Sequence, residues 1–175
     1  SSHRTQVYNN TGSATSYVAP CYASDNVSYI NNTFRSGTNY PLNPDSCDDN
    51  LMKDNLLFGA GGIEVQNSKR SNITGNNIEA NNKNGLLFIY STDNNITSNN
   101  IANNQYGIKF DGDKSQNCFV VGNRIENNEE GIQLFTQSEN VFFHNSFINN
   151  AIQVYVGSKT INEQTWDNGY PSGGN

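Results

Sequence analysis

The stretch Asn72-Ile73-Thr74-Gly75-Asn76-Asn77-Ile78 returns 23 residues later as Asn95-Ile96-Thr97-Ser98-Asn99-Asn100-Ile101. The central residues of these two stretches belong to a series of asparagines spaced 21 to 24 residues apart. The series consists of Asn32, Asn55, Asn76, Asn99, Asn123 and Asn145. A fixed period of this length is typical of solenoids, whose units cannot bury an apolar face alone and must stack on their neighbours.

Each asparagine of the series stands between two apolar residues in the same register. One apolar residue lies three positions before it and another two positions after it, as Ile73 and Ile78 do around Asn76. A third column comes from short alternating runs that mostly begin with glycine, such as Gly107-Ile108-Lys109-Phe110. Alternation with period two is typical of a strand with one buried face. We therefore expect two or three short strands in every repeat.

Two kinds of solenoid have this period. A leucine-rich repeat needs a Leu-dominated consensus and a helical return segment, whereas this chain has seven Leu and no stretch with apolar residues at helical spacing. Its return segments contain Asn-Asn pairs followed by Gly or a small residue, which favour tight turns. The sequence therefore predicts an all-β chain, folded as a parallel β-helix of about six coils with about 20 to 24 residues per coil.

The repeat does not extend over the whole chain. Residues 1–25 lack the asparagine register and are expected to form an irregular N-terminal segment or cap. The β-helix is expected over residues 26–160, with an insertion at 36–50 that contains two prolines and three aspartates. Residues 161–175 leave the repeat and are expected to form a C-terminal tail.

The repeated asparagines have a structural explanation. An asparagine at a bend tolerates positive φ, and its amide can donate a hydrogen bond to one neighbouring coil and accept one from the other. A stack of such residues would satisfy turn backbone that no strand covers. We therefore interpret the series as a structural Asn ladder and assign no ligand to it.

The composition indicates an exported protein. The chain has 33 Asn, only 15% charged residues and a net charge of −6, so amides and hydroxyls dominate its polar surface. It has no basic stripe, which argues against nucleic acid as a partner, and no apolar run near the roughly 18 residues that cross a membrane. Five N-x-Ser/Thr motifs are candidate glycosylation sites on a secreted protein, namely Asn9, Asn26, Asn31, Asn72 and Asn95.

The three cysteines differ in their settings. Cys21 and Cys47 flank the first recognisable coil, where a disulfide would restrain sequence without regular stacking, so we predict that they pair. Cys118 stands apart, two positions before Val120. No neighbouring histidine, lysine or arginine-rich segment would lower its pKa, which favours a packing role over that of a nucleophile.

The two quoted coils, followed by Gly-Ile-x-Phe/Leu strands, resemble the NosD-type right-handed parallel β-helix family. That family includes periplasmic copper-site accessory proteins and archaeal cell-surface proteins. The tail from Trp166 to Asn175 is similar to a segment that closes such repeats in archaeal surface proteins. The resemblance extends over about residues 26–175 and implies a right-handed winding and an exported location. It implies little about chemistry, because the fold hosts enzymes, adhesins and scaffolds.

Few residues are suited to catalysis or metal binding. His3 lies in the irregular N-terminus, and His144 stands beside Asn145, where a hydrogen-bonded turn residue is the favoured interpretation. Asp111-Gly112-Asp113 lacks the spacing and terminal Glu of a calcium loop. Two His and one Met are a poor set of copper ligands. We therefore predict no catalytic residue, no metal site and no cofactor.

The later coils carry apolar residues that should face outward. Ile89, Phe135, Phe143 and Tyr155 are candidates for an interface. The C-terminal tail around Trp166 would cover part of this surface, and the alternative is contact with another subunit or with glycan rings. The ends of a β-helix expose unpaired backbone, so head-to-tail pairing of copies would extend into a filament.

These observations favour an exported, non-catalytic structural or interaction module at the cell surface or outside the cell, with self-assembly into filaments or arrays as one form. The alternative is a carbohydrate-binding or carbohydrate-active domain of the same fold. The expected partners are further copies, other surface proteins or a polysaccharide, without nucleic acid and without a membrane span. A periplasmic location is also compatible with this interpretation.

Overall fold

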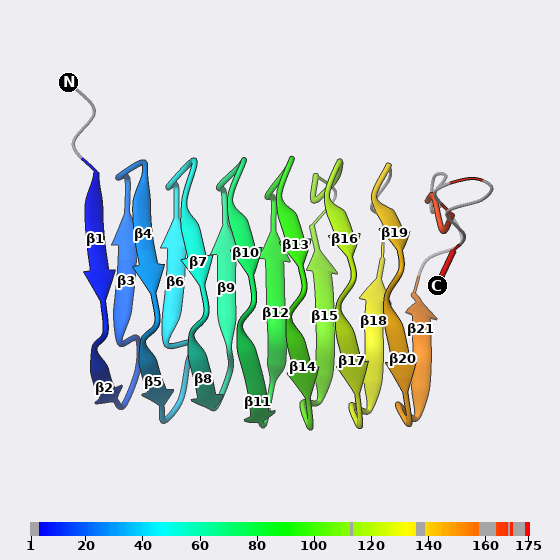
Figure 1. Ribbon diagram of the computed structural model, residues 1–175, viewed down its shortest axis with the longest axis horizontal. Coiled ribbons are helices and arrows are strands. Elements are labelled where there is room, and N and C mark those ends of the chain that lie inside the picture. The colour runs from blue at the N-terminus through cyan, green and yellow to red at the C-terminus, as the bar shows by residue number, and fades with distance from the viewer. Residues whose placement is uncertain (1–3, 113, 136–138, 158–163, 168, 170–173) are drawn as a thin grey trace.

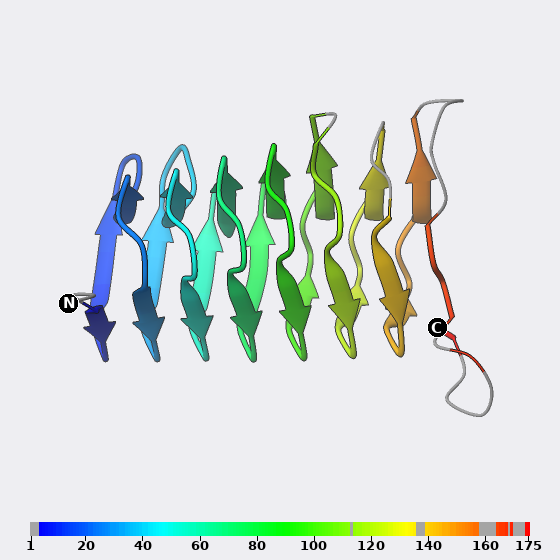
Figure 2. The same ribbon diagram turned by 90° about the horizontal axis from the view of Figure 1, so that it is seen from above.

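The repeat folds as three parallel sheets around one axis in the computed structural model, which describes residues 4–112, 114–135, 139–157, 164–167, 169 and 174–175 (Figures 1 and 2). Each coil contributes one strand to sheet A, one to sheet B and one to sheet C, in this order. The described residues form seven such coils and no helix. The winding is right-handed, as nearly all crossovers between parallel strands are.

The strands of each sheet are paired in register from coil to coil. Sheet A consists of β1 (Thr5–Tyr8), β4 (Val27–Ile30), β7 (Leu51–Lys53), β10 (Asn72–Thr74), β13 (Asn95–Thr97), β16 (Phe119–Val121) and β19 (Val141–Phe143). Sheet B consists of β2 (Thr11–Ala14), β5 (Thr33–Ser36), β8 (Leu56–Gly59), β11 (Asn77–Asn81), β14 (Asn100–Ala102), β17 (Arg124–Glu126) and β20 (Ser146–Ile148). Sheet C consists of β3 (Ala19–Tyr22), β6 (Leu42–Asp45), β9 (Ile63–Gln66), β12 (Asn84–Ile89), β15 (Tyr106–Asp111), β18 (Glu130–Leu134) and β21 (Ile152–Val156).

The apolar columns of the sequence meet inside the coil. Ile73 of sheet A, Ile78 of sheet B and Leu86 of sheet C are fully buried in one core, and the same positions are buried in the neighbouring coils. Along sheet C, the ring of Phe88 stacks on that of Phe110 with centroids 5.1 Å apart. Each coil thus buries its apolar face against the next one, as the period of the sequence predicts.

The Asn ladder lies at the corner between sheets A and B, and Asn76 shows its pattern. Its Oδ1 accepts hydrogen bonds from the backbone N–H and the Nδ2 of Asn55, at 3.0 and 2.9 Å. Its Nδ2 donates to Oδ1 of Asn99 and to the carbonyl oxygen of Met52, both at 2.9 Å. The side chain therefore uses donors and acceptors in both directions along the axis, which explains why no residue but Asn recurs here.

Positive φ angles occur one residue before the ladder and not in it. Asn31, Asp54 and Ser98 each have a φ of 55°, whereas none of the six expected ladder residues has a positive φ. The expectation that these asparagines serve as left-handed turn residues is therefore wrong. Their hydrogen bonds to both neighbouring coils therefore explain why asparagine recurs at these positions.

The first coil lies within residues 5–22, where we expected an irregular cap, so the described residues form seven coils, close to the expected number of about six. Strands β1, β2 and β3 each pair with the next coil over four residues. The coil has a ladder residue, Asn10, whose N–H donates to Oδ1 of Asn32 at 2.9 Å. Its apolar pattern is hidden because Gly12 stands at the inward position of β2. A Cβ there would lie 3.0 Å from a methyl group of Val18 and 3.4 Å from the ring of Phe34.

The segment at 36–50 also contains a regular strand, although we expected an insertion. Strand β6 pairs with β3 over four residues and with β9 through Leu42 and Asp45. Pro41 and Pro44 concealed this strand, because proline lacks the N–H that a central strand donates. The interrupted pairing with β9 lies between Leu42 and Asp45, where Pro44 stands.

The described part of the C-terminal tail continues the stacking. Thr165 forms a parallel bridge with Val141, and the indole of Trp166 stacks on Phe142 with centroids 4.4 Å apart. Oδ1 of Asn175 accepts hydrogen bonds from the N–H and the Nδ2 of Asn145, at 3.1 and 2.9 Å. The tail therefore covers the end of sheet A and adds a last member to the ladder. The rest of residues 161–175, including Tyr170, lies outside the described residues.

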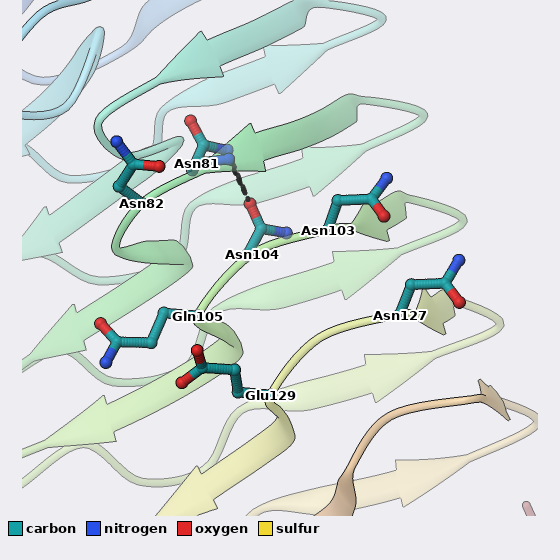
Figure 3. Close-up of a pocket in the computed structure, with 7 residues that line it drawn as sticks. All are labelled: Asn81, Asn82, Asn103, Asn104, Gln105, Asn127 and Glu129. Atoms are coloured by element: carbon teal, nitrogen blue, oxygen red, sulfur yellow. Dashed lines mark hydrogen bonds between the residues drawn. The ribbon is translucent and has the colours of Figure 1, made fainter.

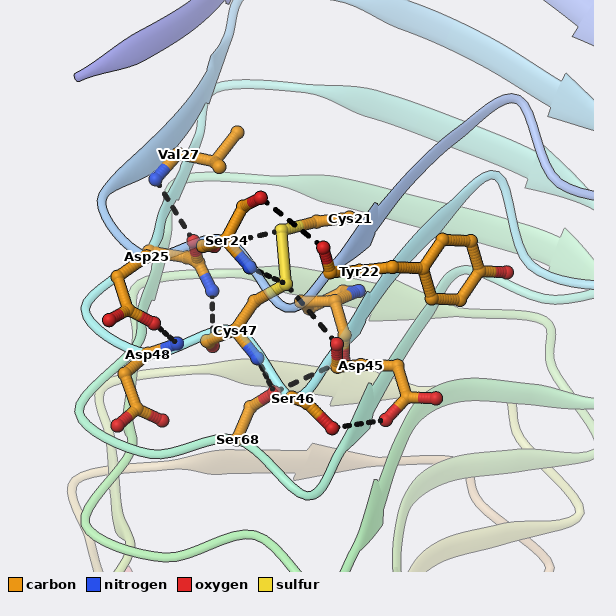
Figure 4. Close-up of a disulfide and its surroundings, with 12 residues drawn as sticks. Cys21, Tyr22, Ser24, Asp25, Val27, Asp45, Ser46, Cys47, Asp48 and Ser68 are labelled. Carbon is orange, nitrogen blue, oxygen red and sulfur yellow. Dashed lines mark hydrogen bonds between the residues drawn. A yellow bond between two sulfur atoms is a disulfide. The ribbon is translucent and has the colours of Figure 1, made fainter. Parts of the chain in front are cut away.

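A disulfide links the first two coils near the turn from sheet C to sheet A (Figure 4). It joins Cys21 and Cys47, which are both buried. The N–H of Cys47 donates to Oγ of Ser68 at 2.9 Å, and the N–H of Val27 donates to Oδ1 of Asn50 at 3.0 Å. A hydroxyl, an amide and a disulfide thus link neighbouring coils at this corner.

Replacing Asn99 by alanine should lower the free energy of unfolding by about 3 kcal/mol, because it removes the hydrogen bonds of this side chain to the N–H and Nδ2 of Asn76, to the carbonyl oxygen of Ile73 and to Oδ1 of Asn123. Urea unfolding followed by circular dichroism measures the loss. The control is Asn100→Ala in the same coil, which removes one hydrogen bond, to Asn77, and should cost about 1 kcal/mol. Equal losses in the two variants would contradict the role of the ladder.

Candidate functional site

A second row of stacked amides lies at the corner between sheets B and C. Oδ1 of Asn104 accepts from Nδ2 of Asn81 at 2.8 Å, and Nδ2 of Asn104 donates to Oδ1 of Asn128 at 3.0 Å. Asn128 makes the same bond to Asn150 at 2.9 Å. All four side chains are buried. We call these four residues the second ladder. Sequence analysis interpreted their Asn-Asn pairs only as turns, although their spacing of 22 to 24 residues would have revealed the row.

Glycines beside the second ladder let the coils approach closely. A Cβ on Gly107 would lie 2.5 Å from the carbonyl oxygen of Gly131 and 3.1 Å from Nδ2 of Asn128. No larger residue fits without moving backbone. This contact explains why glycine recurs as the second residue of β12, β15 and β18.

The second ladder opens outward into a shallow groove of about 500 Å³ over the fourth to sixth coils (Figure 3). Asn82, Gln105 and Glu129 lie along one side of Asn81 and Asn104, and two exposed amides lie along the other. These two amides belong to Asn103 and Asn127, which have φ angles of 58° and 54°. The lining thus consists of six amides and one carboxylate.

The groove is suited to a ligand rich in hydroxyl groups. Each amide presents both donors and acceptors, and a sugar hydroxyl uses both. Equivalent side chains recur once per coil, at about the 4.8 Å spacing of paired strands. The groove therefore offers a regular row of hydrogen-bonding groups parallel to the axis.

A half-buried carboxylate lies outside sheet C in the third coil. Oε2 of Glu64 accepts hydrogen bonds from the hydroxyl of Tyr17 at 3.3 Å and from Nδ2 of Asn43 at 3.1 Å. Burial raises the pKa of Glu64 above its ordinary value, and the hydrogen bond from Tyr17 opposes this shift. Such a group can transfer protons, so its surroundings decide its role.

Long side chains around Glu64 bridge the first four coils at the corner between sheets B and C. The second ladder occupies this corner only from Asn81 in the fourth coil onward. Tyr17 reaches from the first coil to Glu64 in the third. The hydroxyl of Tyr40 in the second coil accepts a hydrogen bond from Nδ2 of Asn84 in the fourth. Nζ of Lys83 donates to the carbonyl oxygen of Thr38 at 2.8 Å. We therefore assign this cluster to the support of the corner and not to chemistry.

The predicted glycosylation sites lie at turns or on an outer face. Asn9, Asn26 and Asn31 have positive φ angles, between 55° and 61°. Asn72 and Asn95 are exposed neighbours on sheet A, and Nδ2 of Asn95 donates to Oδ1 of Asn72 at 3.0 Å. Their glycosylation stays a prediction.

The four interface candidates do not form one patch. Ile89, Phe135 and Tyr155 belong to the sheet C side, whereas Phe143 belongs to sheet A, where its ring meets that of His144 with centroids 5.1 Å apart. The rings of Phe135 and Tyr155 lie edge to face, 6.4 Å between centroids. Neighbouring aromatic rings thus cover part of Phe135, Phe143 and Tyr155. An interface through these residues stays a prediction.

No three His, Cys, Asp or Glu side chains among the described residues lie close enough to hold a metal ion. Asp111 forms an ion pair with Lys109 at 3.7 Å, and its Oδ1 accepts the N–H of Gly112. Asp113 and His3 lie outside the described residues. Burial raises the pKa of the Cys118 thiol to about 12, which keeps it protonated.

Residues 1–175 match a family model described as "Periplasmic copper-binding protein (NosD)". The chain belongs to the NosD family. A comparison with curated protein sequences finds no significant match. The resemblance inferred from the asparagine repeat is thereby confirmed.

Several solved structures share the fold of this NosD-family chain. A double mutant of the periplasmic alginate epimerase AlgG has a TM-score of 0.71 and 24% identity, with 82% of this chain and 36% of that chain covered. A second AlgG mutant has a TM-score of 0.69 and 23% identity over 74% and 32% of the two chains. The A-module of the Azotobacter vinelandii mannuronan C-5 epimerase AlgE6 has a TM-score of 0.65 and 12% identity over 91% and 58%. The chain therefore spans about a third of the AlgG structures, and at these identities the likeness concerns the fold.

The described residues do not fit the copper ion of the family description. Copper sites in proteins use His, Cys and Met side chains. Cys21 and Cys47 form the disulfide, Cys118 is a buried thiol, and Met52 is fully buried in the core. His144 is the one histidine among the described residues, and its ring meets Phe143. We therefore derive no copper chemistry for this NosD-family chain.

The described residues also include no helix long and apolar enough to span a membrane.

Replacing Glu64 by glutamine should raise the free energy of unfolding at pH 7, and the gain should shrink toward pH 4. A raised pKa means that the folded state binds this proton more tightly, so the wild type loses stability as the pH rises from the ordinary pKa of 4.5 through the folded-state pKa. Urea unfolding at both pH values measures the difference. Glu129→Gln removes the same charge from an exposed position and controls for net charge. A Glu64→Gln protein less stable than the wild type at pH 7 would contradict the raised pKa of Glu64.

Proposed function

We propose that this NosD-family chain is an exported, non-catalytic interaction module that binds glycans in the groove over the fourth to sixth coils. The observation that carries the proposal is the lining of six amides and one carboxylate, repeated from coil to coil along the axis. Such a surface exchanges hydrogen bonds with hydroxyl groups at several equivalent places. The rigid stack holds these groups before the ligand arrives, which reduces the entropy that binding costs.

We propose a non-catalytic module because of where the two carboxylates Glu129 and Glu64 lie. Glu129 is the only titratable side chain that lines the groove among the described residues. Acid and base catalysis on a sugar ring needs two such groups on either side of the reacting atoms. Glu64 has a structural explanation outside the groove. A carbohydrate-active domain remains the alternative, with the alginate epimerases as the fold relatives that motivate it.

The proposed location is outside the cytoplasm, at the cell surface, in the extracellular space or in the periplasm. The disulfide between Cys21 and Cys47 supports an oxidising compartment. The family description adds the periplasm as one such compartment.

Replacing Gln105 by alanine should weaken glycan binding about tenfold, because it removes hydrogen bonds at the centre of the groove. Affinity electrophoresis in gels that contain glucan, galactomannan, chitosan or alginate measures the binding. Gln66→Ala is the matched control, since Gln66 is also half-buried but lies outside the groove on sheet C. Retardation by none of the polymers would overturn the proposal. Unsaturated or epimerised products after incubation with alginate would replace it with the enzymatic alternative.

A second proposal is self-association through the C-terminal coil. Ile152 and Val156 in β21 are 43% and 52% exposed, and Tyr155 is 38% exposed. Exposed apolar residues on the last strand of a sheet favour pairing with another chain. We expect dimers or larger species above micromolar concentration, and Val156→Lys should return them to monomers. Light scattering checks this, and a wild type that is monomeric at all concentrations would remove the proposal.

A further inference from the structure

The second ladder begins at Asn81, and the first carbonyl oxygen of the row has no partner. Asn81 is 2% exposed, and its Oδ1 is buried without a hydrogen bond in the structure. Further along the row, Oδ1 of Asn104 and Oδ1 of Asn128 each accept two hydrogen bonds from the preceding coil. The register explains the difference, because Gly59 stands opposite Asn81 in the third coil and has no side chain to donate.

The unpartnered oxygen itself does not open into the groove. Asn81 is one of the lining residues, but its Oδ1 has almost no exposed surface, and Figure 3 shows it directed away from Asn104. The groups that a ligand can reach are the exposed amides of Asn82, Asn103 and Asn127 and the half-buried amide of Gln105. The groove therefore presents its donors and acceptors from side chains next to the second ladder.

The charges around the groove select against an anionic ligand. Its lining contains one carboxylate, Glu129, and no lysine or arginine. The nearest basic residue in the sequence, Lys83, has its Nζ bound to the carbonyl oxygen of Thr38. The whole chain carries a net charge of −6. The carboxylates of a polyuronate would meet a negative charge and no cation in the lining, whereas a neutral chain of hydroxyl groups would meet no charge repulsion.

The geometry also sets the direction of the ligand. Asn82, Gln105 and Glu129 occupy equivalent positions in three successive coils, about 4.8 Å apart. An extended polysaccharide repeats its hydroxyl groups at a similar length per sugar. Its chain can therefore lie along the axis with one sugar for each coil.

We propose that the groove binds a linear, neutral polysaccharide parallel to the helix axis, with its hydroxyl groups bonded to the exposed amides beside the second ladder, Asn82 among them. This inference rests on the proposed glycan-binding function and adds to it the charge, the orientation and the contacting amides of the ligand. It separates this chain from its fold relatives, whose names state alginate as the substrate class.

Isothermal titration calorimetry with purified hexasaccharides tests the charge. The probes are β-1,4-linked glucose, mannose and xylose hexamers and a mannuronate hexamer. At least one neutral hexamer should bind about tenfold or more tightly than the mannuronate hexamer. Glu129→Gln should narrow this gap by improving the binding of mannuronate. Binding of mannuronate as tight as that of every neutral hexamer would overturn the inference and leave the glycan-binding function standing.

Two variants test the contact with the exposed amides. Asn82→Ala should lose about tenfold in affinity for the neutral hexamer. The side chain of Asn82 is exposed, so its replacement should leave the fold intact. Asn150→Ala changes an asparagine outside the groove and should keep the wild-type affinity. Wild-type affinity in Asn82→Ala would overturn the inference. Failure of all hexamers to bind would instead overturn the proposed function.

Discussion

The whole structure depends on the need of buried amides for partners on both sides. In the ladder between sheets A and B, each asparagine satisfies the backbone of the coil before it and relies on the asparagine of the coil after it. A buried polar group without a partner is costly, so one missing amide leaves several groups unsatisfied. This dependence ties the coils together in addition to the apolar core. It also keeps the rise of each coil equal to the spacing of paired strands.

The two ends of the molecule meet this need by different means. The second ladder begins only in the fourth coil, and before it the same corner is held by Tyr17, Tyr40 and Lys83, which reach across two coils. The disulfide adds a covalent link in the same coils. At the other end, Asn175 continues the first ladder from outside the regular repeat. The coils are thus equivalent in backbone and different in what joins them.

Function in such a fold arises where the regular pattern opens to solvent. The parallel β-helix is shared with alginate epimerases, yet at these identities that likeness carries no chemistry. The family description names copper, yet the described sulfur atoms are a disulfide, a buried thiol and a core methionine. The amides that stabilise one corner also line its groove, so one set of residues has a structural and a proposed binding role.

The period of the asparagines and of their apolar neighbours was sufficient to predict a parallel β-helix, because stacked coils need the same side chain at the same place in every turn. The sequence did not reveal the first coil, because Gly12 stands at an inward position whose space Val18 and Phe34 fill. It did not reveal β6 because prolines stand in and beside this strand. Only the tertiary structure showed that Asn81 opens the second ladder with an unpartnered oxygen. That fact depends on which residue stands opposite in the previous coil, and register between distant segments is set by packing and not by local sequence.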